Sequence, residues 1–299
     1  MKKFTYILIF ALLCGLITGC GAAPQADVAA TTMPVTCFAQ ALCQGTPITV
    51  VQLITEEVSC VHDYSLTVDQ MKAIESVDLV LCSGAGLEEF MEDALGAARQ
   101  VADASHGIEL LDGACHHHHE DEEDAHGHED DHGHEADPHI WLSPANACHM
   151  AENIAAALTA EYPQYSQAFQ NNLTDLLAQI EAVDRYAEET LSDLASREII
   201  TFHDGFGYLA HAFDLEILEA IEEESGAEPS AQELIGLIEL VEHHGVAAIF
   251  IEKNGSSSAA GIISAEIGVP VYTLDMAMSG ESWFDAMYHN IDTLKEALG

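Results

Sequence analysis

A run of histidines and carboxylates in the middle of the chain carries the clearest chemistry in the sequence. Between Cys115 and His139 the chain holds nine of its 17 histidines, together with ten aspartates and glutamates. Imidazole and carboxylate groups are the side chains that bind divalent first-row metal ions at neutral pH. The run has almost no apolar residues with which to build a core, so packing does not account for it. We call residues 115–138 the acidic His-rich loop and predict a metal-related role for it.

Two alternative explanations of this loop fit less well. A solvated acidic loop would account for the carboxylates but not for the histidines, and the internal position argues against an affinity tag. We expect weak, accessory metal ligands at His116, His117, His118, His119, His126, His128, His132 and His134.

Three histidines and one aspartate form a second set of candidate ligands, most of them just past predicted strands. His139 stands in the segment Asp-Pro-His-Ile-Trp-Leu-Ser-Pro, and His62 follows an apolar run by a short loop. His203 and Asp275 each end an apolar run that reads as a strand. Three imidazoles and one carboxylate would form a four-coordinate site that suits Zn²⁺, whereas Mn²⁺ prefers more oxygen ligands. We predict that these four residues are the primary ligands.

Glu252 is the rival for the fourth position, because it also follows an apolar run. A single histidine is more often a structural or surface residue than a ligand. We therefore assign to helix surfaces, or to the surroundings of the site, the histidines that lie in helical stretches: His149, His211, His243, His244 and His289.

The N-terminus has the order of an export signal, with two lysines, an apolar stretch and then small residues before a cysteine. The apolar stretch is too short for a permanent membrane span. Its end, Leu16–Cys20, resembles a bacterial lipoprotein box, which implies that Cys20 is acylated; Cys14 is a weaker candidate, and cleavage without lipid is the alternative. We predict a signal peptide at residues 1–19, a tether at residues 20–30, and an extracytoplasmic protein anchored by lipid to the bacterial cell membrane.

The charge balance limits the partners of the mature chain. Without residues 1–19 it has 6 basic and 51 acidic residues, a net charge of −45. Such a surface repels nucleic acid and anionic lipid and attracts cations. With 48% apolar residues the chain is nonetheless globular. We expect a monomer that binds no nucleic acid.

Six cysteines remain when the signal peptide and Cys20 are set aside, and in an exported protein they allow up to three disulfides. Their spacing is not that of a zinc knuckle. We expect Cys82, inside an apolar strand, to be a buried free thiol, and we expect some pairing among the others, which are Cys37, Cys43, Cys60, Cys115 and Cys148.

Short apolar runs alternate with amphipathic stretches on both sides of a long helical region, a pattern that predicts βαβ crossovers and parallel sheets. We therefore predict an α/β fold with two Rossmann-like parallel-sheet lobes joined by one long rigid connector helix. The N-terminal lobe spans 31–143 and includes the acidic His-rich loop and a helix at 87–98; connector helices span 144–196, and the C-terminal lobe spans 197–299. We place the metal site in the cleft between the lobes, at the carboxyl ends of the strands.

Several motifs resemble those of a known family. They are DPHIWLSP, TFHDGFGYLAHAFDLEIL, the segment from GAEPSAQELIGLIEL to GVPVYTLD, and the acidic His-rich loop. With their order and spacing they resemble the zinc-binding solute receptors of bacterial ABC importers, over essentially the whole mature chain. The resemblance implies a two-lobed receptor that holds Zn²⁺ between its lobes and delivers it to a membrane permease and its ATPase.

The resemblance also implies a ligand set. The three histidine ligands of the family fall on His62, His139 and His203, and the carboxylate that often completes the site falls on Asp275. In manganese and iron relatives the third ligand is typically a glutamate, so His203 favours zinc. The chain departs from the family at the first ligand, where Cys60-Val61-His62 replaces the Glu-Pro-His of many relatives.

Two other functions compete with a receptor. In a metal-dependent hydrolase, Asp204 would act as general base toward a metal-bound water; the simpler role for Asp204 is the N-cap of the helix that follows. The chain has no His-Glu-x-x-His or Gly-x-Ser-x-Gly motif, and we predict no enzymatic activity. In a surface metal buffer, the acidic His-rich loop would do the main work.

Overall fold

The computed structural model describes residues 26–56, 61, 64–113, 136–222, 230–255 and 258–299. Two parallel sheets, each of four strands, form the framework, and they have the orders β2-β1-β3-β4 and β6-β5-β7-β8. The predicted α/β fold with two parallel-sheet lobes is therefore confirmed. The first sheet contains β1 (Val28–Ala30), β2 (Val50–Gln52), β3 (Leu79–Cys82) and β4 (Val101–Asp103). The second contains β5 (Glu198–His203), β6 (Glu216–Glu222), β7 (Ile249–Glu252) and β8 (Val271–Leu274).

Strand β1 corrects one predicted boundary. It lies between β2 and β3, and its three residues are fully buried. The tether predicted at residues 20–30 is therefore wrong at its C-terminal end, because residues 28–30 belong to the core. Two of the three are alanines, whose small side chains let helix α2 (Met33–Leu42) pack on the strand. A run this short and this alanine-rich lacks the apolar pattern that marks a strand.

Of the two short helical regions that follow β2, one forms as its sequence predicts and the other is shorter than predicted. Helix α3 (Val68–Ser76) begins with a capping box between Thr67 and Gln70, as its sequence predicts. In place of one helix at 87–98 the chain forms the 3₁₀ turn η1 (Glu89–Met91) and the short helix α4 (Glu92–Leu95). The helix predicted at 87–98 was therefore too long.

The buried Glu88 gives a reason for the late start of these helices. Its carboxylate accepts hydrogen bonds from the Thr31 hydroxyl at 2.6 Å, from the Ser83 backbone N–H at 2.7 Å and from the Gly84 N–H at 2.9 Å. These bonds hold Glu88 against the carboxyl ends of β1 and β3, so a regular helix begins only after it.

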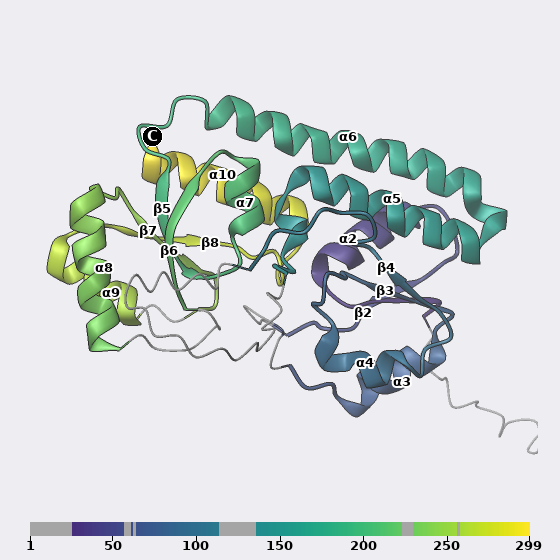
Figure 1. Cartoon of the computed structure of the whole chain (residues 1–299). Coiled ribbons are helices and arrows are strands. Elements are labelled where there is room, and N and C mark those ends of the chain that lie inside the picture. Colours follow the sequence, from purple (N-terminus) through teal and green to yellow (C-terminus); the bar gives the residue numbers. More distant parts are fainter. Residues whose placement is uncertain (1–25, 57–60, 62–63, 114–135, 223–229, 256–257) are drawn as a thin grey trace, which may run out of the picture.

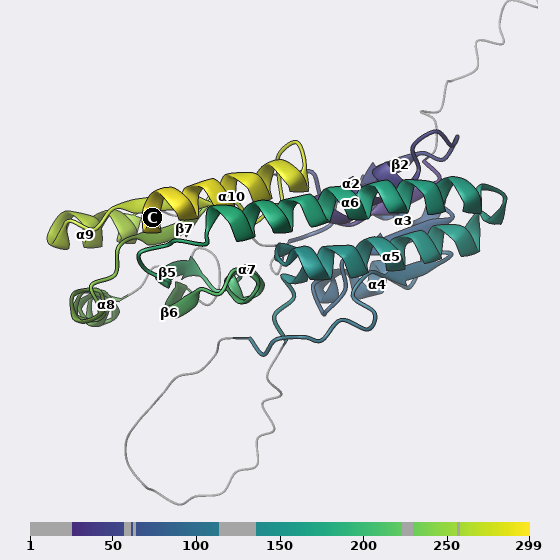
Figure 2. The ribbon, with the colours of Figure 1, turned by 90° about the horizontal axis from the view of Figure 1, so that it is seen from above.

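Two long helices follow the first sheet. Helix α5 (Pro144–Glu161) begins with Ser143 as its cap and Pro144 in its first turn. After the 3₁₀ turn η3 (Pro163–Tyr165), α6 (Ser166–Thr190) runs for 25 residues, or about 37 Å, and passes along both lobes (Figures 1 and 2). Its buried stripe consists of Phe169, Leu176, Ile180, Val183 and Ala187. The long connector helix is confirmed.

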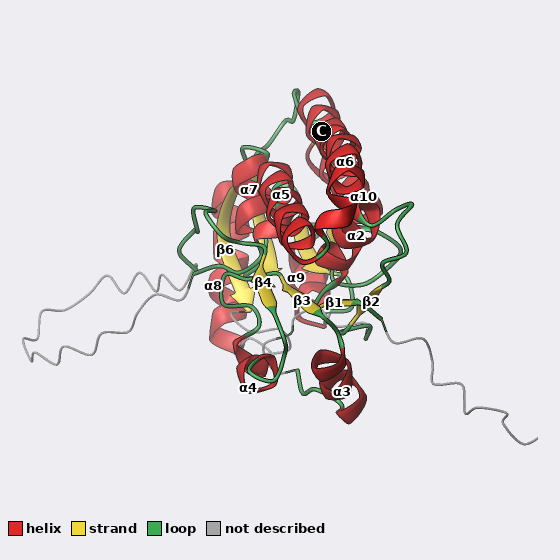
Figure 3. Cartoon of the chain, turned by 90° about the vertical axis from the view of Figure 1, so that its right-hand side faces the viewer, coloured by secondary structure: helices red, strands yellow, loops and turns green. Residues whose placement is uncertain are grey.

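The helices of the C-terminal lobe cover both faces of its sheet (Figure 3). They are α7 (Gly207–Ala212), α8 (Ala231–His244), α9 (Ser258–Ile267) and α10 (Trp283–Leu298). A small apolar core, which includes Phe202, Val241 and Ile263, lies between the sheet, α8 and α9. The other face joins a larger core that continues into the N-terminal lobe and includes Phe250 and Met287.

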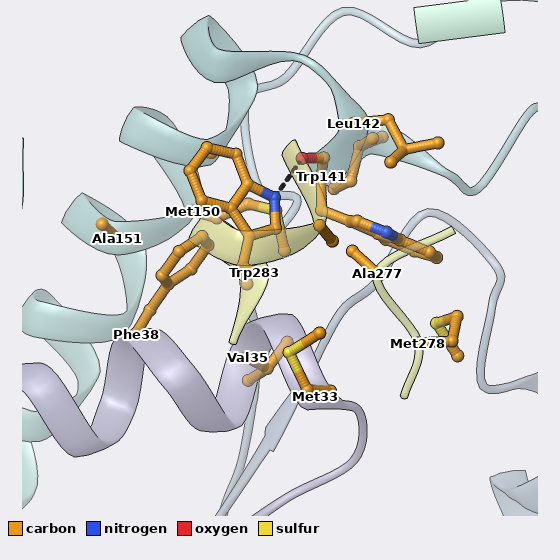
Figure 4. Close-up of a cluster of buried hydrophobic side chains, with 14 of the residues drawn as sticks. Met33, Val35, Phe38, Trp141, Leu142, Met150, Ala151, Ala277, Met278 and Trp283 are labelled. Carbon is orange, nitrogen blue, oxygen red and sulfur yellow. Dashed lines mark hydrogen bonds between the residues drawn. The ribbon is translucent and has the colours of Figure 1, made fainter. Parts of the chain in front are cut away.

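Two tryptophans join the lobes inside this larger core. The indole N–H of Trp141, in the 3₁₀ turn η2 (Ile140–Leu142), donates to the Met276 carbonyl at 2.8 Å, and that of Trp283 donates to the Trp141 carbonyl at 2.8 Å. Figure 4 shows Trp283 between Phe38 of α2 and the Trp141 backbone, and the Phe38 and Trp283 ring centroids are 5.5 Å apart. Each indole is buried with its single donor satisfied, so this junction is well defined.

The described cysteines are all free thiols: Cys37, Cys43, Cys82 and Cys148. Cys82 is buried, as predicted. Cys37, Cys43 and Cys148 form no disulfide, so Cys60 with Cys115 is the one pair that the expectation still allows. Burial raises the pKa of the Cys43 thiol to about 12 and that of Cys148 to about 11, so both are protonated thiols at neutral pH. Cys60 and Cys115 lie outside the described residues.

No helix in the described part of the chain has the length and apolar character to span a membrane.

Candidate metal centre

His139 is held by a carboxylate two residues before it. Its ring Nδ1 lies 2.8 Å from Oδ1 of Asp137, and the same oxygen accepts the His139 backbone N–H at 2.9 Å. Both side chains are buried. A carboxylate on one ring nitrogen fixes the tautomer and orients the other nitrogen, Nε2, as a metal ligand. His139 thus has the surroundings of a ligand.

His203 faces His139 from the second sheet. It is the last residue of β5 and only 1% exposed, and the centroids of the two imidazole rings lie 5.3 Å apart with the ring planes at 90°. The carboxyl ends of parallel strands are where ligand sites form in such sheets. Two of the predicted ligands, distant in the sequence, are therefore brought together.

Two glycines leave room for this pair. A Cβ atom at Gly205 would lie 2.7 Å from Cδ2 and 2.8 Å from Nε2 of His203, and one at Gly207 would lie 2.8 Å from Oδ2 of Asp137. Contacts shorter than about 3 Å are repulsive, so any side chain at Gly205 would displace the His203 ring. These glycines follow His203 in the segment His-Asp-Gly-Phe-Gly.

Asp275 follows β8, and both of its carboxylate oxygens have partners. Oδ2 lies 2.9 Å from Nζ of Lys253, and Oδ1 accepts the Ala277 backbone N–H at 2.9 Å. The buried Asn290 of α10 fixes the backbone of Asp275, accepting its N–H at 2.7 Å and donating to its carbonyl at 2.8 Å. Asp275 is thus a buried, firmly positioned carboxylate in an ion pair with a lysine.

The rival carboxylate, Glu252, ends the neighbouring strand. Since β7 lies between β5 and β8, His203, Glu252 and Asp275 come from the carboxyl ends of three adjacent strands. Glu252 is 1% exposed, and a Cβ atom at Gly255 would lie 2.3 Å from its carboxyl carbon. Both candidate carboxylates therefore lie at the sheet edge that carries His203.

The other predicted residues fall into two groups. His62, Cys20 and the eight accessory histidines lie outside the described residues. Across the described ranges, no three His, Cys, Asp or Glu side chains are gathered closely enough to hold a metal ion. The histidines that we assigned to helix surfaces or to the surroundings of the site are all exposed, which fits the first of these two assignments: His149, His211, His243, His244 and His289. The N-cap of α7 is Phe206, so the prediction that Asp204 caps that helix is wrong.

Sequence reasoning missed four residues around the site. Asp137 was one carboxylate among the ten near the acidic His-rich loop, although its place two residues before a predicted ligand was a usable signal. Gly205 stands two residues after His203. Lys253 and Asn290 reach Asp275 from other elements, and only the pairing of β7 with β8 and the packing of α10 bring them there.

Two parallel-sheet lobes, a long helix packed along both, and facing histidines from both halves of the chain define a two-lobed solute-binding protein. The chain matches the family described as zinc-uptake complex component A, periplasmic, over residues 28–297, and it belongs to that family.

Three comparisons, with two named relatives, agree with this assignment. The zinc-binding lipoprotein AdcA of Streptococcus pneumoniae is 30% identical over 314 residues, which cover 99% of this chain but 61% of that longer protein. The Zn(II)-bound ZnuA-like domain of Streptococcus pneumoniae AdcA has a TM-score of 0.75 at 26% identity, covering 92% of this chain and 99% of that domain. A crystal structure of ZnuA gives a TM-score of 0.77 at 26% identity, covering 92% of this chain and 100% of that one.

Proposed function

We propose that this chain is an extracytoplasmic receptor that binds Zn²⁺ between its lobes and delivers it to a membrane ABC permease with its ATPase. The observation that carries the proposal is the pair of buried, perpendicular imidazoles of His139 and His203, with the first ring held by Asp137. Membership of the zinc-uptake family supports the choice of cargo and transporter. A receptor needs only reversible binding, and we assign no catalytic step to this site.

The proposed ligands are His62, His139, His203 and Asp275. Three neutral imidazoles and one carboxylate match the preference of Zn²⁺ for nitrogen-rich, four-coordinate sites. Mn²⁺ is the less favoured cargo, because it prefers sites with more oxygen donors. Glu252 remains the alternative carboxylate, since it ends the strand between those that position His203 and Asp275.

The proposal also covers the N-terminal segment, the oligomeric state and the acidic His-rich loop. We propose that Cys20 carries the lipid that anchors the receptor, that residues 1–19 are removed, and that the receptor acts as a monomer. The histidines of the acidic His-rich loop act as weak accessory ligands that raise the local metal concentration. The high negative charge of the chain attracts cations in the same way over longer distances.

A deletion separates this function from a metal buffer. Asp112 and Ala136 form an antiparallel bridge, and the Asp137 N–H donates to the Leu111 carbonyl at 2.9 Å, so the ends of the loop are adjacent in space. Residues 116–135 can therefore be replaced by a short Gly-Ser linker that keeps the bridge between Asp112 and Ala136. A receptor retains one tight zinc site in calorimetric titration and loses only weak ones. Loss of nearly all zinc capacity would instead identify a buffer.

A further inference from the structure

Strand pairing places a lysine on the proposed fourth ligand. β7 and β8 are parallel neighbours, with Glu252 opposite Leu274. One residue further, the Lys253 backbone N–H donates to the Leu274 carbonyl at 2.8 Å. The side chains of Lys253 and Asp275 therefore leave adjacent strand ends, and their Nζ and Oδ2 atoms lie 2.9 Å apart. The ion pair follows from the register of the sheet.

Positively charged residues such as this lysine are rare in the chain. The sequence has only 8 lysines and arginines against 51 acidic residues. One of these few cations forms its ion pair with an aspartate whose side chain is only 10% exposed. An ammonium group that contacts a carboxylate oxygen excludes a divalent cation from that oxygen, because the two positive charges repel and the lone pairs are already engaged.

The lysine is the part of this pair that can move. Asp275 is held through its backbone by Asn290 and through Oδ1 by the Ala277 N–H. The Lys253 side chain is 45% exposed and lines an open pocket together with Ser279, Gly280, Glu281, Asp285 and His289. Gly280 lines the space next to the ammonium group and puts no side chain into it. A Cβ atom at this position would lie 3.6 Å from Nζ of Lys253. The ammonium can turn into this pocket, where Glu281 and Asp285 offer other carboxylates, while Asp275 stays in place.

We propose that Lys253, through its ion pair with Asp275, competes with the metal ion for the fourth ligand position and must leave Oδ2 of Asp275 before a metal ion can use that oxygen. The inference rests on the proposed function. Lys253 then lowers the affinity for metal, and its return to Asp275 favours release of the cargo. It also limits the number of oxygen donors that an incoming ion meets.

The test is a zinc titration against a chelator of known affinity, made on the soluble mature chain and its variants. Lys253→Met removes the charge and keeps most of the apolar stem, and we expect it to bind Zn²⁺ about tenfold more tightly than the native chain, because both the competitor and the repulsion are gone. Lys253→Arg keeps the charge and should bind no more tightly than the native chain. In an Asp275→Asn background, Lys253→Met should change the affinity by less than about twofold.

Two results would overturn the inference. One is a folded Lys253→Met variant with unchanged or weaker zinc affinity, which is what a merely structural ion pair would give. The other is equal tightening in the Asp275→Asn background, which would mean that the lysine acts by long-range repulsion alone. His203→Ala is titrated in parallel. If it keeps a tight site, the proposed function fails; if it loses the site, the Lys253 variants still decide the inference on their own.

Discussion

Asp137 receives two hydrogen bonds from His139, one from the ring Nδ1 at 2.8 Å and one from the backbone N–H at 2.9 Å. Both bonds end on the same oxygen, Oδ1, so a single carboxylate fixes the position and the tautomer of the histidine. Partners of this kind raise the basicity of a ligand and orient it toward the metal.

We expect Asp137→Asn to weaken zinc binding by about 10- to 100-fold with little change in fold, since partners of metal ligands have effects of this size. An amide in this position no longer carries the charge that favours a proton on Nδ1. Asp112→Asn is the matched control, because Asp112 is exposed near the same segment and should leave the affinity unchanged. Equal affinities in a chelator competition for Asp137→Asn and the native chain would rule out this role for Asp137.

Gly205 is the second position whose change should act on the site. A Cβ atom there would approach His203 Cδ2 to 2.7 Å and Met276 Cε to 2.7 Å, so Gly205→Ala must displace the imidazole from its position in the site. We expect a loss of zinc affinity of at least about tenfold. The control is Gly236→Ala in α8, where a Cβ meets nothing within 4 Å and the exchange should stabilise the helix by roughly 0.5–1 kcal/mol. Zinc titration and thermal unfolding of both variants check the prediction.

The buried Glu88 makes stability depend on pH. Burial raises the pKa of its carboxyl above the ordinary value of 4.5, against the lowering effect of its bonds from Thr31, Gly84 and Ser83. The native state then holds the proton more tightly than the unfolded chain does. The contribution of Glu88 to stability is therefore complete below pH 4.5 and falls as the pH rises through the raised pKa.

Glu88→Gln isolates this contribution, because glutamine does not titrate. It also turns one acceptor into a donor opposite a backbone N–H, which costs about 1–3 kcal/mol. We expect the difference in free energy of unfolding, native minus variant, to become smaller between pH 4.5 and neutrality. Urea unfolding at several pH values measures it, and a difference that grows with pH would contradict the assignment.

The sequence predicts those parts of the fold that depend on local sequence patterns. Thr67 with Gln70 and Ser230 with Glu233 form capping boxes, whose residue types and spacing mark the starts of α3 and α8. His203 and Asp275 were found because each follows an apolar strand, and the carboxyl ends of parallel strands meet at one edge of a sheet.

The parts of the fold and of the site that the sequence does not predict depend on contacts between residues far apart in the chain. Strand β1 is three residues long and is recognised only by the two strands that pair with it. The hydrogen bond from the Trp283 indole to the Trp141 carbonyl joins residues 142 positions apart, and no local sequence pattern predicts it. The Lys253–Asp275 pair likewise requires the register of β7 and β8, which side-chain periodicity does not specify.

The most direct test of the receptor is a calorimetric titration of the soluble mature chain with Zn²⁺, beside His203→Ala and His211→Ala. His203 is buried at the end of β5, whereas His211 is exposed on α7 in the same segment of the chain. We predict that His211→Ala keeps one tight site and that His203→Ala loses it, because removing one of the four proposed ligands leaves an incomplete coordination sphere. A folded His203→Ala variant that binds one Zn²⁺ with undiminished affinity would contradict the assigned metal centre.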